Sequence, residues 1–257
     1  MRIYVCIKHV PDTAARITIL GKNRIDERVT FIMNPYDENA VEEATGIKRD
    51  VGDAEVIAVT LGSQAAEATL QSALAMGADR GILIKTEDHP DSMITAAALK
   101  AAIESDGKPD LIFTGKESID SEGFQTMYRL AAGFRIPAAS NVVSFSLESD
   151  SAVVECEMEG GSREVIAMSL PCVIGAGKSL NKPNYPTLPD IMKARKKEIK
   201  HVDLKDLGFE KPAGRIEALE LKPAVEDRQP KEITGTPDEV AVKIVRILKE
   251  EARVLHD

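Results

Sequence analysis

Short apolar segments alternate with helix-forming segments over the first half of the chain, and this alternation restricts the possible folds more than any other feature. Four apolar segments have the length and composition of buried strands. They are 2–7, 54–61, 80–85 and 110–114. Helix-forming segments lie between them at 34–50, 64–76 and 92–105. Strands separated by such helices form a parallel sheet with right-handed crossovers and helices on both faces. The sequence therefore predicts the α/β class, with a doubly wound parallel sheet.

The helix expected at 34–50 has signals at both ends. Asn34 is a suitable N-cap, Pro35 occupies the first helical position, acidic residues fill the first turn and basic residues lie near the end. Apolar residues at helical spacing predict the buried face, which consists of Ala40, Val41, Ala44 and Ile47. We expect Glu42 and Glu43 to stay in solvent.

The pattern changes after Pro137. Three segments alternate apolar and polar residues, with turns between them, and predict a small antiparallel extension. They are 142–147, 152–158 and 162–168. Glu155, Glu157 and Glu159 share one face at the strand period of two, so we expect a solvated surface there rather than a metal site. A last buried strand is expected at 170–174, and a short surface hairpin at 16–30.

The stretch 108–125, KPDLIFTGKESIDSEGFQ, combines a buried strand, a glycine and a polar turn that precedes a helix. In an open parallel sheet, ligands bind beyond the carboxyl ends of the strands, where a helix N-terminus offers unpaired N–H groups to a phosphate. Taken alone, the stretch is typical of a plain strand-to-helix connection. Gly115 is a single glycine, and neither GxGxxG nor a Walker motif is present.

Composition argues against several classes of function. The formal net charge is −9 and 4% of the residues are aromatic, so we expect no nucleic acid as a partner. No run of about 18 apolar residues occurs, so we expect no membrane insertion, and the first residues form a strand rather than a signal peptide. Cys6, Cys156 and Cys172 lie far apart without a CxxC, which indicates a reducing compartment. We therefore expect a cytoplasmic protein.

The C-terminal part is organised differently. A loop rich in proline and asparagine precedes a short basic helix at 188–197, and it fits either an interaction loop or a flexible linker. Residues 199–236 are polar and proline-punctuated, whereas 238–254 predict an amphipathic helix. An arm without its own core must pack on its own domain or on a partner subunit.

Several segments resemble the β subunit of electron-transfer flavoproteins, and the resemblance covers nearly the whole chain. They are CIKHVPD, MNPYDENAVEEA, ALAMGADRGILI, TGKESIDSEGFQ and LPCVIGAGKSLNKPNYPTLPDIMKARKK, of which the last is the most specific. The resemblance implies a Rossmann-like domain of the adenine-nucleotide-binding type at 1–198, with a recognition loop at 176–190, and an arm at 199–257 that packs on the α subunit. It also implies a heterodimer in which the α subunit holds the redox-active FAD and the β subunit holds an AMP.

The resemblance further implies the cofactor-binding residues, which are expected at strand ends and helix starts along one edge of the sheet. They are Cys6, Asn34, Pro35, Tyr36, Asp37, Leu61, Lys116, Glu117, Ser118, Ile119, Asp120, Ser121, Glu122, Gly123, Phe124, Gln125, Thr126 and Met127. Relatives commonly have a glycine at the position of Met127, and Glu122 and Phe124 also depart from the usual residues. We expect the Met127 side chain to crowd a phosphate and Glu122 to repel it.

The same resemblance implies a docking site for a partner dehydrogenase, with Leu188 as the anchoring leucine. The expected docking residues are Leu188, Pro189, Ile191, Met192 and Lys193. A single apolar anchor suits a carrier that must dock and leave quickly. The implied function is electron transfer from dehydrogenases, such as acyl-CoA dehydrogenases, to a membrane or soluble electron-accepting oxidoreductase, without catalytic residues of the chain's own.

Two alternatives stay open. One branch of the family holds a second FAD in the β subunit in place of AMP, oxidises NADH and bifurcates electrons, but the loop 116–127 lacks that branch's usual DGDTAQVGP-like form. The other alternative is a stand-alone adenine-nucleotide-binding regulatory protein with the same fold. A yellow complex with an α chain indicates the carrier, whereas a colourless monomer that binds ATP indicates the regulator.

Overall fold

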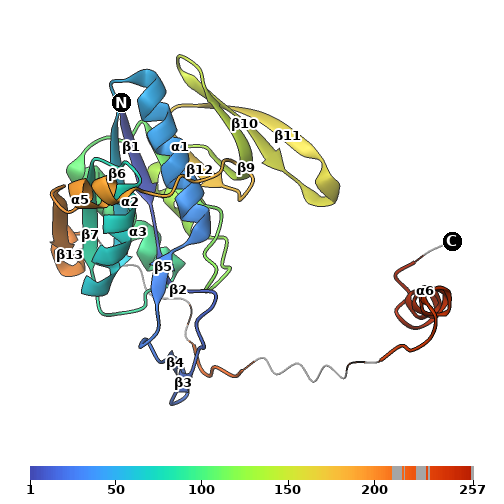
Figure 1. The fold of residues 1–257 in the computed structure, drawn as a ribbon. Coiled ribbons are helices and arrows are strands. Elements are labelled where there is room, and N and C mark those ends of the chain that lie inside the picture. Colours follow the sequence, from blue (N-terminus) through green and yellow to red (C-terminus); the bar gives the residue numbers. More distant parts are fainter. Residues whose placement is uncertain (210–215, 217, 224–229, 231, 256–257) are drawn as a thin grey trace. The chain divides into compact units, whose positions relative to one another are not determined.

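The computed structural model describes residues 1–209, 216, 218–223, 230 and 232–255, so parts of the arm expected at 199–257 lie outside the described residues. The chain forms two compact units, 1–220 and 221–257. The first unit contains a nine-stranded sheet with helices on both faces (Figure 1), which confirms the predicted α/β class.

Most strands of the large sheet run parallel. In spatial order they are β12 (Cys172–Ala176), β8 (Leu111–Gly115), β1 (Arg2–Cys6), β6 (Glu55–Gly62), β7 (Arg80–Lys85) and β13 (Ile199–Asp203). β9 (Ala138–Leu147) begins parallel to β12 and continues antiparallel to β10 (Ser151–Glu157). β10 pairs in turn with β11 (Arg163–Ser169), after a 3₁₀ turn at Glu159–Gly161. The predicted antiparallel extension is confirmed, and it continues the same sheet.

Alternation along β1 divides the core between the two faces of this sheet. Ile3, Val5 and Ile7 lie in one buried cluster with α1 (Pro35–Val51) and α2 (Glu67–Ala75), which follows a 3₁₀ turn at Gln64–Ala66. Tyr4 and Cys6 lie in the other cluster with α3 (Ser92–Asp106) and α4 (Thr126–Phe134). The sheet is therefore doubly wound, as predicted.

Helix α1 confirms the helix predicted from 34, with its four expected core residues buried. One expectation about its surface was wrong. Glu42, expected in solvent, is only 7% exposed, because the loop after β12 covers it and donates hydrogen bonds to its carboxylate. Glu43 is half-buried and accepts a hydrogen bond from Asn181.

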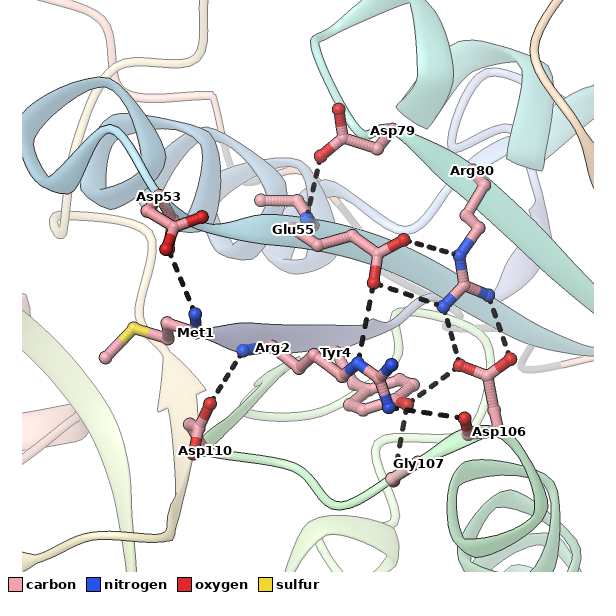
Figure 2. A network of polar contacts seen from close by, with 11 residues as sticks. Met1, Arg2, Tyr4, Asp53, Glu55, Asp79, Arg80, Asp106, Gly107 and Asp110 are labelled. Atoms are coloured by element: carbon pink, nitrogen blue, oxygen red, sulfur yellow. Dashed lines mark hydrogen bonds and ion pairs between the residues drawn. The ribbon is translucent and has the colours of Figure 1, made fainter.

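A network of polar side chains lies at the edge of the sheet where the parallel strands begin (Figure 2). The Arg80 guanidinium contacts Glu55 (Nε to Oε1, 2.7 Å) and Asp106 (Nη2 to Oδ2, 2.7 Å), and the Tyr4 hydroxyl donates to Asp106 at 2.8 Å. Burial and the Asp106 carboxylate raise the pKa of Tyr4, so its phenol stays neutral. This network joins β1, β6, β7 and α3, and the opposite edge is where such sheets bind ligands.

Short strands at the surface were only partly predicted. The hairpin expected at 16–30 is confirmed by β3 (Ile19–Leu20) and β4 (Arg24–Ile25). β2 (His9–Pro11) pairs with β5 (Phe31–Met33), and the sequence had not predicted this pairing. β13 lies beside β7, followed by a 3₁₀ turn at Leu204–Leu207, in a part of the chain where the sequence analysis expected no strand.

The second unit contains α6 (Pro237–Arg246), which continues into a π-helical turn at Ile247–Glu251. Thr236 and Glu239 form a capping box at its start. Val242, Ile244 and Val245 are exposed on this helix. The predicted amphipathic helix is confirmed and is shorter than expected.

Candidate functional site

A buried carboxylate, Asp37, joins the carboxyl ends of β1 and β8 to the first turn of α1. Its Oδ2 accepts a hydrogen bond from the backbone N–H of Lys8 (2.7 Å), and its Oδ1 accepts from the backbone N–H of Gly115 (2.8 Å) and from Asn34 Nδ2 (3.0 Å). Burial raises the pKa of Asp37 to about 7, although the hydrogen bonds and the Lys8 ammonium act in the opposite direction. Three segments distant in sequence are thereby fixed at one point.

Gly115 allows this close approach. A Cβ at this position would overlap Asp37 Oδ1 and would lie 2.7 Å from Tyr36 Cβ and 3.0 Å from Asn34 Nδ2. The single glycine noted in the sequence is therefore required by packing and not by a left-handed backbone.

Asn34 links the start of α1 to the loop 116–125. It occupies the N-cap position, but its side chain makes no cap hydrogen bond. Its Nδ2 instead donates to the carbonyl oxygen of Glu117 (2.8 Å), and its Oδ1 accepts from the backbone N–H of Ile119 (3.1 Å). The structure thus brings together Asn34, Asp37 and the first half of the predicted nucleotide loop.

Lys8 is a residue of this site that the sequence analysis missed. Its ammonium donates to Asp120 Oδ1 (2.7 Å), Ser118 Oγ (3.2 Å) and Ser121 Oγ (3.4 Å). The side chain therefore holds the middle of the loop, while the backbone N–H of the same residue holds Asp37. The signal available in the sequence was a lysine two residues beyond a buried strand, which is a common and unspecific pattern.

Cys6 and Leu61 lie at the same edge of the sheet but take no part in these side-chain hydrogen bonds. Cys6 ends β1 and is paired with Val59 on β6 and with Thr114 on β8. Burial and the nearby Asp37 carboxylate raise the pKa of its thiol to about 12, so it carries no thiolate at neutral pH. Leu61 is partly buried against the cluster that contains Cys6.

The second half of the loop is exposed and bends sharply. Glu122 (φ 46°) and Phe124 (φ 54°) have left-handed backbones on either side of Gly123. α4 then begins at Thr126, and its N-cap residue Gln125 makes no side-chain cap hydrogen bond. The N–H groups of a first helical turn have no intrahelical acceptor, so this turn has donors that can meet an anion.

Lys116 places a positive charge beside the exposed part of the loop. Its Nζ lies 5.2 Å from the ring centroid of Tyr36 and 5.4 Å from that of Phe124, distances typical of cation–π contacts. The same ammonium is 3.4 Å from Glu117 Oε1. Pro35 precedes Tyr36 at the first position of α1. The two aromatic rings are thus gathered around one lysine.

Met127 points toward the sheet. Its side chain is 2% exposed and packs in the cluster with α3 and β12. A Cβ at Gly175 would overlap its Sδ and lie 2.9 Å from its Cε, so the space left by this glycine accommodates the thioether. The Met127 side chain is therefore packed into the core, and this position gives no support to the expectation that it crowds a phosphate.

The predicted docking residues form a separate surface on α5 (Leu188–Ala194). Leu188 is 78% exposed, Met192 is 68% exposed, and Pro189, Ile191 and Lys193 are also exposed. Thr187 and Asp190 form a capping box that fixes the start of the helix, with Thr187 Oγ1 2.5 Å from Asp190 Oδ2. The sequence prediction placed this helix correctly but extended it beyond Ala194.

Within the described ranges, no group of three or more His, Cys, Asp or Glu side chains is arranged to hold a metal ion. Glu155 contacts Arg163 at 2.9 Å, as suits a residue on an exposed sheet face. None of the helices in the part of the chain that the structure describes has the length and apolar character needed to cross a membrane.

Comparison with known proteins identifies the family. The family described as "Electron transfer flavoprotein domain" matches residues 23–207. The chain is 34% identical over 260 residues to the electron transfer flavoprotein subunit beta of Bacillus subtilis, covering 99% of this chain and 100% of the relative. It is 35% identical over 259 residues to the human subunit beta and 34% identical over 256 residues to that of Dictyostelium discoideum, each with 99% of both chains covered. The chain therefore belongs to the electron transfer flavoprotein family, as a β subunit.

Proposed function

We propose that this β subunit forms a heterodimeric electron carrier with an α subunit that holds FAD. The carrier accepts electrons from dehydrogenases, such as acyl-CoA dehydrogenases, and passes them to a membrane or soluble oxidoreductase. When bound, FAD supplies the reversible electron transfer, and this chain supplies a docking surface. Its three cysteines are buried and unpaired, which supports a cytoplasmic location.

The observation that carries this proposal is the apolar surface of α5. Leu188 and Met192 lie four residues apart, on one side of a helix whose start is capped, and Tyr185, 89% exposed, precedes them. Large apolar side chains gathered on one exposed segment are typical of a protein interaction site. An apolar surface limited to this short segment would allow the fast dissociation that a carrier needs.

The loop 116–127 is proposed as the site of an AMP in the β subunit. The residues present fit such a group: the backbone N–H groups at the start of α4 have no side-chain cap and could bind an anion, Lys116 and Lys8 are nearby cations, and Met127 is packed into the core. Glu122 opposes an anion, and its exposure to solvent weakens that repulsion. No residue of this loop is assigned a catalytic role.

The nucleotide content of the purified complex tests the cofactor assignment. The proposal expects one FAD and one AMP per heterodimer, both released by denaturation and quantified by chromatography. Two FAD per heterodimer together with reduction by NADH would instead establish the bifurcating type. A colourless chain that purifies without an α subunit and binds ATP would overturn the carrier.

Docking is tested by Leu188→Ala. We expect the apparent KM for the carrier in the dehydrogenase reaction to rise about tenfold, with FAD content unchanged, because truncating a central apolar anchor costs on the order of 1 to 2 kcal/mol. Val165→Ala on β11 is the matched control, since it removes a similarly exposed apolar side chain (66% exposed) outside both α5 and the arm. Equal kinetics for Leu188→Ala and the unmodified carrier would remove the docking assignment.

A further inference from the structure

The loop that leads into the docking helix is held onto α1 by a set of polar contacts, which we call the loop clamp (Asn39, Glu42, Glu43, Asn181 and Asn184). Asn39 Nδ2 donates to the carbonyl oxygen of Asn181 (2.9 Å), and Asn181 Nδ2 donates to the carbonyl oxygen of Asn39 (2.9 Å) and to Glu43 Oε2 (2.9 Å). Asn184 donates to Glu42 from its backbone N–H (3.1 Å to Oε2) and from its Nδ2 (2.9 Å to Oε1). Positions 39, 42 and 43 have helical spacing, so they form one stripe along α1.

Glu42 is the centre of the clamp. Its side chain is 8% exposed, and its Oε1 also contacts Arg49 Nη2 at 3.0 Å. A carboxylate buried to this extent needs donors, and its hydrogen bonds are of the strong, charge-assisted kind. Asn184 supplies two of them, so the backbone of the loop is fixed at this residue.

A second anchor lies at the other end of the docking segment. Ala194, at the end of α5, is 1% exposed, and the Lys197 ammonium donates to the carbonyl oxygens of Leu74 (2.9 Å), in the last turn of α2, and of Ala78 (2.6 Å), just beyond it. Residues 185–193, most of which are exposed, therefore lie between two points that are tied to the domain. Between these two points, Tyr185 is 89% exposed and Leu188 is 78% exposed.

We propose that Glu42 and its partner Asn184 are positioning residues for docking. By fixing the loop before α5, they hold Leu188 and Met192 in the orientation that a partner dehydrogenase meets. A segment ordered before binding loses less conformational entropy on association, so the clamp strengthens docking without touching the partner. This inference rests on the proposed docking function of α5.

The first test is hydrogen–deuterium exchange on the full-length chain purified with its α subunit. In Glu42→Gln, the amide group replaces one acceptor by a donor, so one of the Asn184 bonds is lost. We expect amide exchange in 181–187 to become about tenfold faster, which corresponds to a loss of about 1.4 kcal/mol, with exchange in the strands of the sheet unchanged. Asn184→Ala is the second variant and should give the same local change. Asp50→Asn, an exposed carboxylate on the same helix, is the control.

The second test separates docking from folding. An acyl-CoA dehydrogenase reduced by its acyl-CoA serves as the electron donor. We expect Glu42→Gln and Asn184→Ala to raise the apparent KM for the carrier about threefold to tenfold, with kcat and FAD content unchanged. If Leu188→Ala raises KM but neither clamp variant changes KM or exchange, the clamp inference is overturned while the docking function stands. If Leu188→Ala also leaves KM unchanged, the docking function itself fails.

Discussion

The packing at Gly115 gives the sharpest test of the site, because the structure shows which atoms an added methyl group would contact. In Gly115→Ala, the new Cβ would overlap Asp37 Oδ1 and approach Tyr36 Cβ at 2.7 Å. Neither neighbour can easily move, since Asp37 is buried and holds the backbone of Lys8. Overpacking of a core site costs about 1 to 3 kcal/mol, and each hydrogen bond lost adds about 0.5 to 1.5 kcal/mol.

We therefore expect Gly115→Ala to lower the free energy of unfolding by about 3 kcal/mol and the melting temperature by roughly 6 to 12 °C. Urea and thermal unfolding of the purified complex measure both values, and the AMP content reports the state of the loop. Gly46→Ala on α1 is the matched control, because a Cβ there meets only Arg49 Nη2 at 3.6 Å, an ordinary van der Waals contact, and its stability should not fall. If Gly115→Ala proved as stable as this control, the packing role assigned to Gly115 beside Asp37 would be wrong.

Three further perturbations address neighbouring contacts. Lys8→Met removes the ammonium that holds the loop, so amide exchange in 118–121 should rise about tenfold, and Lys8→Arg should restore part of the protection; equal exchange in Lys8→Met and the unmodified chain would contradict this role. The pKa of Asp37 is raised from 3.8 to about 7, so the folded state binds more protons in this window, and stability relative to Asp37→Asn should fall as the pH rises from 3.8 to 7. Urea titrations at a series of pH values measure the difference, and a constant difference would refute the shift. Thr187→Ala removes the capping box, so α5 should lose about 1 kcal/mol of local stability, seen as faster exchange in 188–194; unchanged exchange there would show that the cap is dispensable.

The fold was predictable because its signals are local. Helix α1 (Pro35–Val51) carries a proline at its start, acids in its first turn and an apolar stripe, and each of these acts through neighbours along the chain. The central strands β1, β6, β7 and β8 are short apolar segments that can be recognised from the sequence alone. β13 is half-exposed at the sheet edge and has a polar sequence. Its strand conformation depends on its pairing with β7, which the local sequence does not indicate.

The site was predictable only in part, because its contacts join residues that are distant in sequence. Asn34 and Asp37 were expected at the edge of the sheet, but their partners Glu117 and Gly115 lie 83 and 78 residues away. The same reason explains the wrong expectation for Glu42. A glutamate beside the apolar face of a helix is usually solvated, and only its contact with Asn184, 142 residues away, shows that it is buried.

Helix α1 connects the two proposed functions of the chain. Asn34 and Asp37, at its start, hold the loop 116–125, whereas Glu42, in the middle of the helix, holds the loop that leads to α5. Its apolar side packs on the sheet, so both loops are fixed to the same rigid support. A nucleotide bound at the first loop would stabilise the start of α1 without contacting Leu188. Under the proposal of an AMP at this loop, the nucleotide would order the helix on which the docking segment depends.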